Sequence, residues 1–170
     1  MKFSNAIKSA MPVFILGCLA LGLTPTSAVA QANPATTTFT VSATVLKDCA
    51  VSATALPFGN YTGAVNNTTS TVTVSCTKST TYSVGLGTGL ATGASVSTRQ
   101  MQNGTNLLNY SLCSDSAACA TNWGNTLATN WVTGTGTGAA QALTVYGQIP
   151  AAQYVTPGSY TDTITVTVTY

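Results

Sequence analysis

The side chains that could carry acid–base chemistry are few and far apart in the sequence. The 170 residues include no histidine and three acidic residues, which are Asp48, Asp115 and Asp162. General acid–base catalysis needs a positioned proton donor and acceptor, and glycoside hydrolysis needs two carboxyl groups around one bond. A serine or threonine nucleophile needs a neighbouring base, and the sequence contains no Gly-x-Ser-x-Gly nucleophile elbow. We therefore expect no catalytic residue and no enzymatic activity.

The glycine-rich stretch 134–139 formally matches the Gly-x-Gly-x-x-Ala fingerprint of dinucleotide-binding proteins. In that motif a helix follows the glycines, and an acidic residue lies about 20 residues further on. Here the next segment, Ala142–Ile149, has the composition of a strand, and no acidic residue lies near that spacing. We interpret the stretch as a loop between strands and expect no cofactor.

Residues 1–30 have the pattern of an export signal. Lys2 and Lys8 precede the apolar run Met11–Leu23, and Ala28-Val29-Ala30 is a small-residue cleavage site. This run is shorter than the roughly 20 apolar residues of a transmembrane helix, and no later segment approaches that length. We expect a mature protein of about 140 residues that forms one domain, is exported from the cytoplasm and has no membrane span.

Removal of residues 1–30 leaves a chain with almost no charge. Lys47, Lys78 and Arg99 remain against the three aspartates, so the net charge is zero. Three scattered cations cannot form a surface that follows phosphate groups, and we expect neither nucleic acid nor an anionic membrane as a partner. So few charges give little repulsion between molecules, which favours a packed assembly over a free monomer.

Four cysteines lie in the expected mature chain, at Cys49, Cys76, Cys113 and Cys119. Because histidine and Cys-x-x-Cys pairs are missing from the sequence, we expect no metal site. An even number of cysteines in an exported protein favours disulfides, and four cysteines allow three pairings. We favour Cys49 with Cys76, which would join two early strands, and Cys113 with Cys119, which would close a short turn.

The last eleven residues alternate strictly between threonine and larger side chains. One face carries Tyr160, Asp162, Ile164, Val166, Val168 and Tyr170. Such a period of two predicts a strand with one face toward a core and one toward water. Because the printed sequence ends with this strand, we expect its free edge to be covered by a strand from elsewhere.

Further strands are predicted by the same alternation. They are expected at Phe39–Val45, Thr71–Cys76, Tyr82–Leu86, Leu107–Cys113 and Ala142–Ile149. Threonine and valine favour extended structure, and no window of ten residues shows a convincing helical period. The predicted fold is all-β, a sandwich of six or seven short strands.

Two tryptophans, Trp123 and Trp131, lie in a polar segment. An exposed tryptophan could bind sugar rings or an apolar surface, whereas a buried one would fill an end of the sandwich. We favour the packing role.

Several sequence pieces together have a recognisable pattern. They are Asp48-Cys49, Leu56-Pro57-Phe58-Gly59-Asn60-Tyr61, Thr73-Val74-Ser75-Cys76-Thr77, Arg99-Gln100-Met101, Leu108-Asn109-Tyr110-Ser111-Leu112, Asn122-Trp123-Gly124, Leu143-Thr144-Val145-Tyr146-Gly147-Gln148-Ile149-Pro150 and Pro157-Gly158-Ser159-Tyr160-Thr161-Asp162-Thr163. On these pieces the sequence resembles the spore coat protein U domain family, which includes subunits of archaic chaperone-usher pili.

The resemblance implies an immunoglobulin-like β-sandwich over residues 49–170 that lacks its last strand and is completed by donor-strand exchange. It implies a periplasmic chaperone, an outer-membrane usher and neighbouring subunits as partners, and a surface fibre for adhesion and biofilm formation. Residues 31–48 would contain the donor, with Phe39, Val41, Ala43 and Val45 as its buried side chains. The acceptor groove and chaperone-binding strand would present Ile164, Val166, Val168 and Tyr170.

Two alternatives remain at this point. Phe39–Val45 could be the domain's own first strand, with the donor nearer Gln31. The whole chain could also be a secreted spore-coat protein or a glycan-binding β-sandwich module that uses Trp123 or Trp131.

Overall fold

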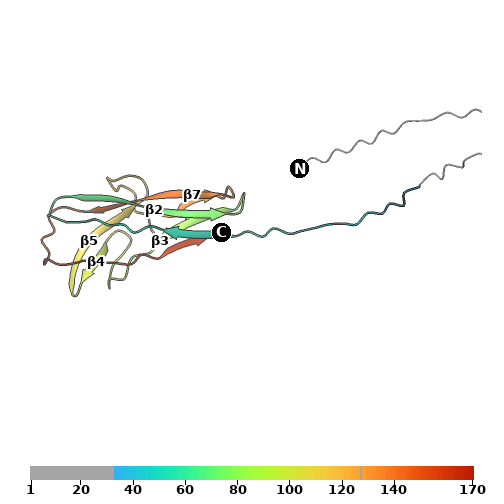
Figure 1. Ribbon diagram of the computed structural model, residues 1–170. Coiled ribbons are helices and arrows are strands. Elements are labelled where there is room, and N and C mark those ends of the chain that lie inside the picture. Colours follow the sequence, from blue (N-terminus) through green and yellow to red (C-terminus); the bar gives the residue numbers. More distant parts are fainter. Residues whose placement is uncertain (1–32, 127) are drawn as a thin grey trace, which may run out of the picture. The chain divides into compact units, whose positions relative to one another are not determined.

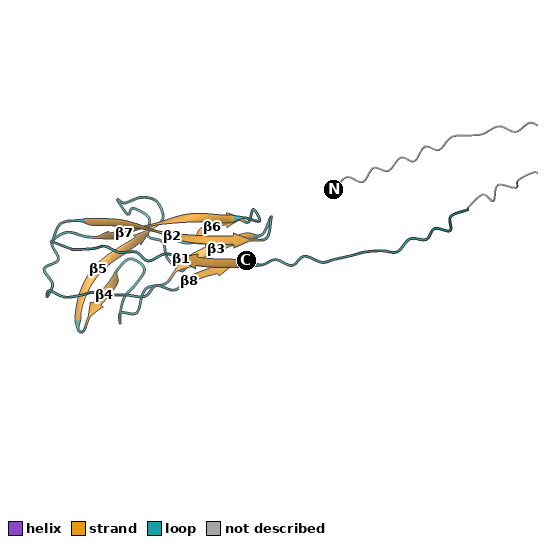
Figure 2. Ribbon diagram, in the orientation of Figure 1, coloured by secondary structure: helices purple, strands orange, loops and turns teal. Residues whose placement is uncertain are grey.

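All regular secondary structure of the described residues is β-strand (Figure 2). The computed structural model describes residues 33–126 and 128–170, so the predicted export signal at residues 1–30 lies outside the described part. The strands are β1 Cys49–Ala53, β2 Asn66–Cys76, β3 Thr81–Leu86, β4 Arg99–Asn103, β5 Asn106–Cys113, β6 Val132–Thr135, β7 Ala140–Ile149 and β8 Val166–Thr169. Within the described ranges, no helix has the length and apolar character needed to cross a membrane.

The strands form two antiparallel sheets (Figure 1). One has five strands in the order β1-β2-β7-β5-β4, and the other has three in the order β6-β3-β8. Side chains from both sheets form one core, in which Val74 of β2, Val84 of β3 and Leu112 of β5 are buried. The predicted all-β sandwich is therefore confirmed.

Alternation explains why β2 forms and which face it buries. Val72, Val74 and Cys76 are buried, whereas Thr73 and Ser75 between them point outward and are half-buried and exposed, respectively. Full burial of a valine contributes about 1.5–3 kcal/mol, so these positions hold the register of the strand. The strands predicted near β2, β3, β5 and β7 are all present, with β2 starting five residues earlier than predicted.

The predicted strand at Phe39–Val45 is wrong for the chain on its own. Residues 33–48, all of them described, belong to no strand, and the first strand of the domain is β1. An extended segment forms the hydrogen bonds of a β-ladder only beside another strand, and alternation alone does not supply that neighbour. The chain divides into the units 1–42 and 43–170, and the described residues of the first unit, 33–42, are exposed.

The last predicted strand is shorter in the structure. β8 covers Val166–Thr169, and Thr161 joins the sheet separately through a bridge to Gln102 of β4. The segment thus leaves the edge of the large sheet and then pairs with β3 of the small sheet. Its side chains nevertheless alternate as predicted, because the even-numbered positions from Tyr160 to Val168 are half-buried and the odd-numbered ones are exposed.

β6 occupies part of the stretch that was predicted to be a loop. Gly134 lies directly opposite Tyr82 of β3, and a β-carbon at this position would collide with the tyrosine ring. Glycine is a poor strand former, but here it makes room for a buried aromatic side chain. Tertiary contacts therefore decide this strand against local propensity.

Two disulfides are present among the residues that the structure describes. Cys49 and Cys76 are directly opposite in the β1–β2 ladder and are bonded to each other. Cys113 at the end of β5 is bonded to Cys119, six residues further on. The first therefore fastens the edge strand β1 to the sheet, and the second closes the loop that leads to Trp123.

Candidate functional site

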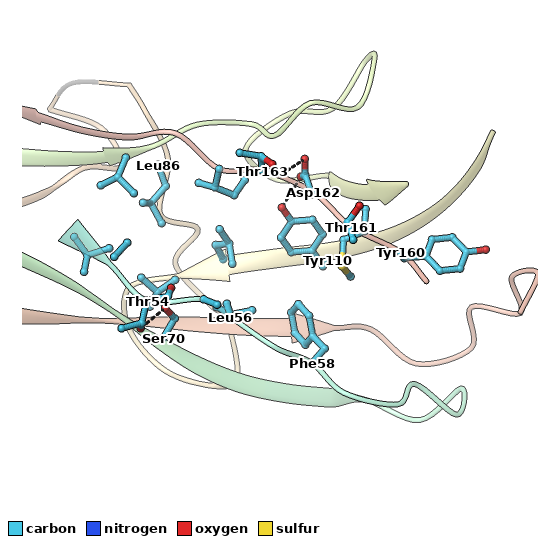
Figure 3. Close-up of a pocket in the computed structure, with 18 residues that line it drawn as sticks. Thr54, Leu56, Phe58, Ser70, Leu86, Tyr110, Tyr160, Thr161, Asp162 and Thr163 are labelled. Atoms are coloured by element: carbon cyan, nitrogen blue, oxygen red, sulfur yellow. Dashed lines mark hydrogen bonds between the residues drawn. The ribbon is translucent and has the colours of Figure 1, made fainter. Parts of the chain in front are cut away.

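A groove of about 430 Å³ opens into the core between the end of β1 and the segment that leads into β8 (Figure 3). One wall is formed by residues 53–56 and Phe58, and the other by residues 160–164 and Val166. Core side chains form its base, among them Val72, Leu86, Leu112 and Val145. The groove therefore exposes the interior of the sandwich along a line between its two sheets.

The inner face of β1 is uncovered at this groove. Val51 and Ala53 lie directly opposite Val74 and Val72 of β2, and residues directly opposite each other point to the same face of a sheet. Val72 and Val74 are buried, whereas Val51 and Ala53 are exposed. The layer that covers β2 therefore does not extend over β1 in the described structure.

The wall that leads into β8 also presents an unused backbone edge. Thr161 exchanges two backbone hydrogen bonds with Gln102, and the Thr165 carbonyl accepts one from the Gly87 amide at 2.9 Å. Backbone groups of successive residues in a strand point to opposite sides. Those of Asp162, Ile164 and Val166 therefore point to the other edge.

The same reasoning applies to β1. Its even-numbered residues face β2, because the Asp48 carbonyl accepts from Thr77 at 2.9 Å and the Thr54 amide donates to Thr71 at 3.0 Å. The backbone groups of Val51 and Ala53 thus point away from β2. Each wall of the groove has a row of backbone donors and acceptors that an added strand could use.

One polar contact crosses from the base of the groove to its wall. Tyr110 of β5 donates a hydrogen bond to Oδ2 of Asp162 at 2.6 Å (Figure 3). Oδ1 of Asp162 accepts from the amides of Leu90 at 2.8 Å and Thr163 at 2.7 Å. Burial, reinforced by the hydrogen bond to Asp162, raises the pKa of the Tyr110 phenol, so this group stays a neutral donor.

Arg99 is buried beside this contact and holds the end of β3 in place. Its guanidinium donates to four backbone carbonyls, those of Gly87 at 2.8 Å, Val96 at 3.0 Å, Leu86 at 3.0 Å and Trp123 at 2.7 Å. Burial lowers its pKa, and the nearby Tyr110 and Asp162 partly offset this effect. Arg99 lies in one of the sequence pieces that resemble the family, but the sequence did not indicate its structural role. The available signal was that Arg99 is one of only three cationic residues after position 30.

The two tryptophans both pack against β3. Trp123 is buried, and its indole N–H donates to the Val84 carbonyl at 2.8 Å, which confirms the packing role for this residue. Trp131 is half-buried and lies against Gly85, where a β-carbon would collide with the indole.

The predicted donor side chains are exposed. Phe39, Val41 and Val45 keep 85%, 82% and 85% of their surface accessible, and Ala43 is also exposed. Of the predicted acceptor residues, Ile164 and Val166 line the groove. Val168 lies further along β8, directly opposite Val84, and Tyr170 follows the end of the strand and is about half exposed.

The three aspartates do not form an acid–base site. The Asp48 amide donates to the Thr77 hydroxyl, Asp115 accepts from the Ala120 amide, and Asp162 accepts from Tyr110. In the ranges 33–126 and 128–170, no three side chains of the metal-binding types converge. The chemistry that the groove supports is the binding of an apolar, extended segment.

A second, wider groove of about 930 Å³ continues from the first. The two share Leu56, Phe58, Met101 and Tyr160. The second groove is otherwise lined by the loops 57–63 and 153–159 and by Leu108 and Ile149. Together the two grooves show that the walls run in opposite directions, since residues 56–58 lie near Tyr160 and Ala53 near Val166.

Comparison with known proteins gives one family and one fold. A family model described as the Spore Coat Protein U domain matches residues 35–167. No curated protein matches the chain. Among solved structures, a similar chain occurs in the crystal structure of the CsuC–CsuE chaperone–tip adhesion subunit pre-assembly complex from the archaic chaperone-usher Csu pili of Acinetobacter baumannii, with a TM-score of 0.57 and 24% identity.

That likeness covers 75% of the present chain and 41% of the solved one, so the chain spans less than half the length of the protein it matches. At this identity the match shows a shared fold. The two-sheet arrangement is thus that of an immunoglobulin-like β-sandwich, as the sequence resemblance implied.

Proposed function

The chain belongs to the Spore Coat Protein U domain family, and on that premise we propose that it is a structural subunit of an archaic chaperone-usher pilus that polymerises by donor-strand complementation. The observation that carries the proposal is the open groove between β1 and the segment leading into β8. It combines an apolar base with an unused backbone edge on each wall, which is what an added strand requires.

The amino-terminal segment has the properties of the strand that would fill the groove. Phe39, Val41 and Val45 are exposed, apolar and on one side of an alternating segment, and the domain already has β1 as its own first strand. Burial of these side chains and Ala43 would contribute on the order of 5–10 kcal/mol before the cost of ordering the segment. Such a link between subunits would be long-lived.

Chain connectivity indicates that the donor comes from a second molecule. All strand pairs of the two sheets are antiparallel, and a strand antiparallel to β8 would run parallel to β1, because the two walls run in opposite directions. A donor in this direction would end near Phe58, whereas Asp48 directly precedes the start of β1. If the donor came from the same chain, the residues after Val45 would have to run back from the Phe58 end to Cys49, a distance of roughly 30 Å. Residues 46–48 can span only about 10 Å.

The proposed partners follow from an unfilled groove. A subunit with an exposed strand edge and an open core would aggregate unless both were covered. We therefore expect a periplasmic chaperone to cover the groove first, and the donor strand of the next subunit to replace the chaperone at an outer-membrane usher. The fibre would be exported to the cell surface and serve adhesion and biofilm formation. A glycan-binding module is less well supported, because Trp123 is buried and Trp131 alone remains for such a role.

Moving the donor within the chain tests the proposal. Residues 35–47 are removed from the front and attached after Tyr170 through a flexible linker of roughly five to ten residues, which raises the effective concentration of the segment to about millimolar. We expect a soluble monomer that needs no chaperone, forms no fibres and melts well above the native-order subunit. The matched control carries Val41→Asp in the moved segment and should lose the gain.

Two outcomes would count against the proposal. One is a fused protein that is no more stable than its Val41→Asp control. The other is a native-order mature protein that, without any chaperone, is already a monomer with full hydrogen-exchange protection in β1 and β8.

A further inference from the structure

The groove is not uniform along its length, and this bears on how a donor would fit. The residues of the β8-side wall that face the groove are Tyr160, Asp162, Ile164 and Val166. Three of them are largely apolar, whereas Asp162 is tied to Tyr110 by the 2.6 Å hydrogen bond between wall and base. Oδ1 of Asp162 is held by two further backbone amides, so the carboxylate is fixed in position.

A donor side chain that lies against this contact removes water from a carboxylate without giving it a new hydrogen bond. That cost grows with the size of the apolar group, because a larger group excludes more water. A small side chain is therefore favoured opposite Asp162. Among the four alternating donor residues, Ala43 is the smallest.

We propose that Ala43 of a second copy of this chain lies opposite Asp162, and that the Tyr110–Asp162 contact thereby sets the register of the donor segment. This inference rests on the proposed function. In an antiparallel arrangement it places Val45 opposite Tyr160, Val41 opposite Ile164 and Phe39 opposite Val166.

The lengths agree with this register. Phe39 to Val45 and Tyr160 to Val166 are both six residue steps, or about 20 Å of extended chain. A shift by two residues in one direction puts Val45 against Asp162 and the charged Lys47 against Tyr160. The opposite shift by two residues puts Val41 against Asp162 and moves Val45 past Tyr160, outside the groove. A shift by one residue would turn the threonine and serine side chains of the donor into the groove.

The opposite end of the groove suits the largest donor side chain. The facing wall carries the small residues Ala53 and Ala55 there. Val166 pairs with Leu86 of β3, so the base at this end is apolar. Phe39 would fill the space that the alanines leave, while Ala43, the smallest donor residue, would lie against the Tyr110–Asp162 contact.

Cysteine pairs in assembled fibres test the register. Residues opposite each other in antiparallel strands have Cα atoms about 4.5–5.5 Å apart, within the range of a disulfide. We expect Val41→Cys combined with Ile164→Cys to give a ladder of cross-linked subunits after mild oxidation. The matched pair, Val41→Cys with Val166→Cys, is displaced by two residues and should give none.

The outcomes separate the register from the proposed function. Cross-links in the Val166→Cys pair, or fibres without cross-links in either pair, would overturn the register while fibre assembly itself stands. If the fused monomer described above is not stabilised, the proposed function fails and the register fails with it.

A size test on the donor gives a second readout. Ala43→Leu should reduce fibre yield at least about tenfold, because leucine would desolvate the Asp162 carboxylate. Val41→Leu adds bulk opposite Ile164 and should change the yield little. The fused monomer reports the same contact through its melting temperature, which Ala43→Leu should lower more than Val41→Leu. Equal effects of the two substitutions would contradict the assignment.

Discussion

Val51 lies directly opposite Val74 in the β1–β2 ladder, yet Val74 is fully buried and Val51 keeps 41% of its surface exposed. The two side chains point to the same face of one sheet. The difference arises because β1 is the edge strand of its sheet and is covered less than its neighbour β2. We therefore expect Val51 to contribute more to stability when a donor strand covers it than in the subunit alone.

Substitution of these two valines should reveal that difference. Val74→Ala removes two buried methyl-sized groups and should lower the free energy of unfolding by about 1.5–3 kcal/mol in any form of the protein. Val51→Ala should cost less than about 0.5 kcal/mol in the native-order subunit but more than about 1 kcal/mol in the fused, donor-complemented monomer. Denaturant unfolding measures both. Equal costs of Val51→Ala in the two forms would show that no strand covers β1.

The two disulfides should differ in their effect on stability. The loops span 27 and 6 residues of sequence separation, and constraint of the unfolded chain predicts about 3–4 and 2 kcal/mol, respectively. Replacing Cys49 and Cys76 by alanine should therefore lower the melting temperature more than replacing Cys113 and Cys119. Non-reducing peptide mapping of the wild-type protein checks the pairing, and a peptide linking Cys49 to Cys113 or Cys119 would contradict it.

A charge on the groove-facing side of β8 should block assembly. Val166→Asp places a carboxylate where the groove is apolar, so binding of either a chaperone or a donor strand should fall sharply. Thr167→Asp introduces the same charge one residue further on, at an exposed position, and serves as the control. Fibre yield and chaperone co-purification are the measurements. Fibres from Val166→Asp would remove this wall from the proposed interface.

The Tyr110–Asp162 hydrogen bond should make stability depend on alkaline pH. Burial and the bond to Asp162 raise the pKa of Tyr110 in the folded state above the ordinary value of about 10. Its contribution is therefore fully present below pH 10 and is lost as pH rises, because the unfolded state releases a proton that the folded state retains.

Tyr110→Phe should reduce the loss of unfolding free energy at alkaline pH by up to about 1.4 kcal/mol per pH unit, which is the slope for one proton. It should also lower stability at neutral pH by about 1–3 kcal/mol, because Asp162 loses a hydrogen-bond donor. Urea unfolding between pH 8 and about 11 tests both effects. Tyr82→Phe is the control, since Tyr82 is also buried but is not bonded to a carboxylate. Parallel pH curves for wild type and Tyr110→Phe would argue against this role.

Local pattern in the sequence was sufficient for the elements that bury one face. Alternating threonine and valine predicted β2, and the same period predicted β3, β5 and β7. In a half-buried strand successive side chains point alternately to the core and to water, so apolar and polar residues alternate. The alternation from Tyr160 to Val168 likewise indicated which positions face inward. Composition also led us to expect no catalysis, because a sequence without histidine offers few groups that could transfer a proton.

Pairing was decided only by the tertiary structure. Phe39–Val45 alternates as clearly as β2 but forms no strand, since a strand exists through hydrogen bonds to a neighbour that its own residues do not specify. β6 forms around Gly134 because Tyr82 occupies the space that a side chain would need. Arg99 is buried because carbonyls from three separate segments converge on it, and the Tyr110–Asp162 contact joins residues 52 positions apart. Such convergence depends on how distant segments pack together, and a local period in the sequence carries no information about it.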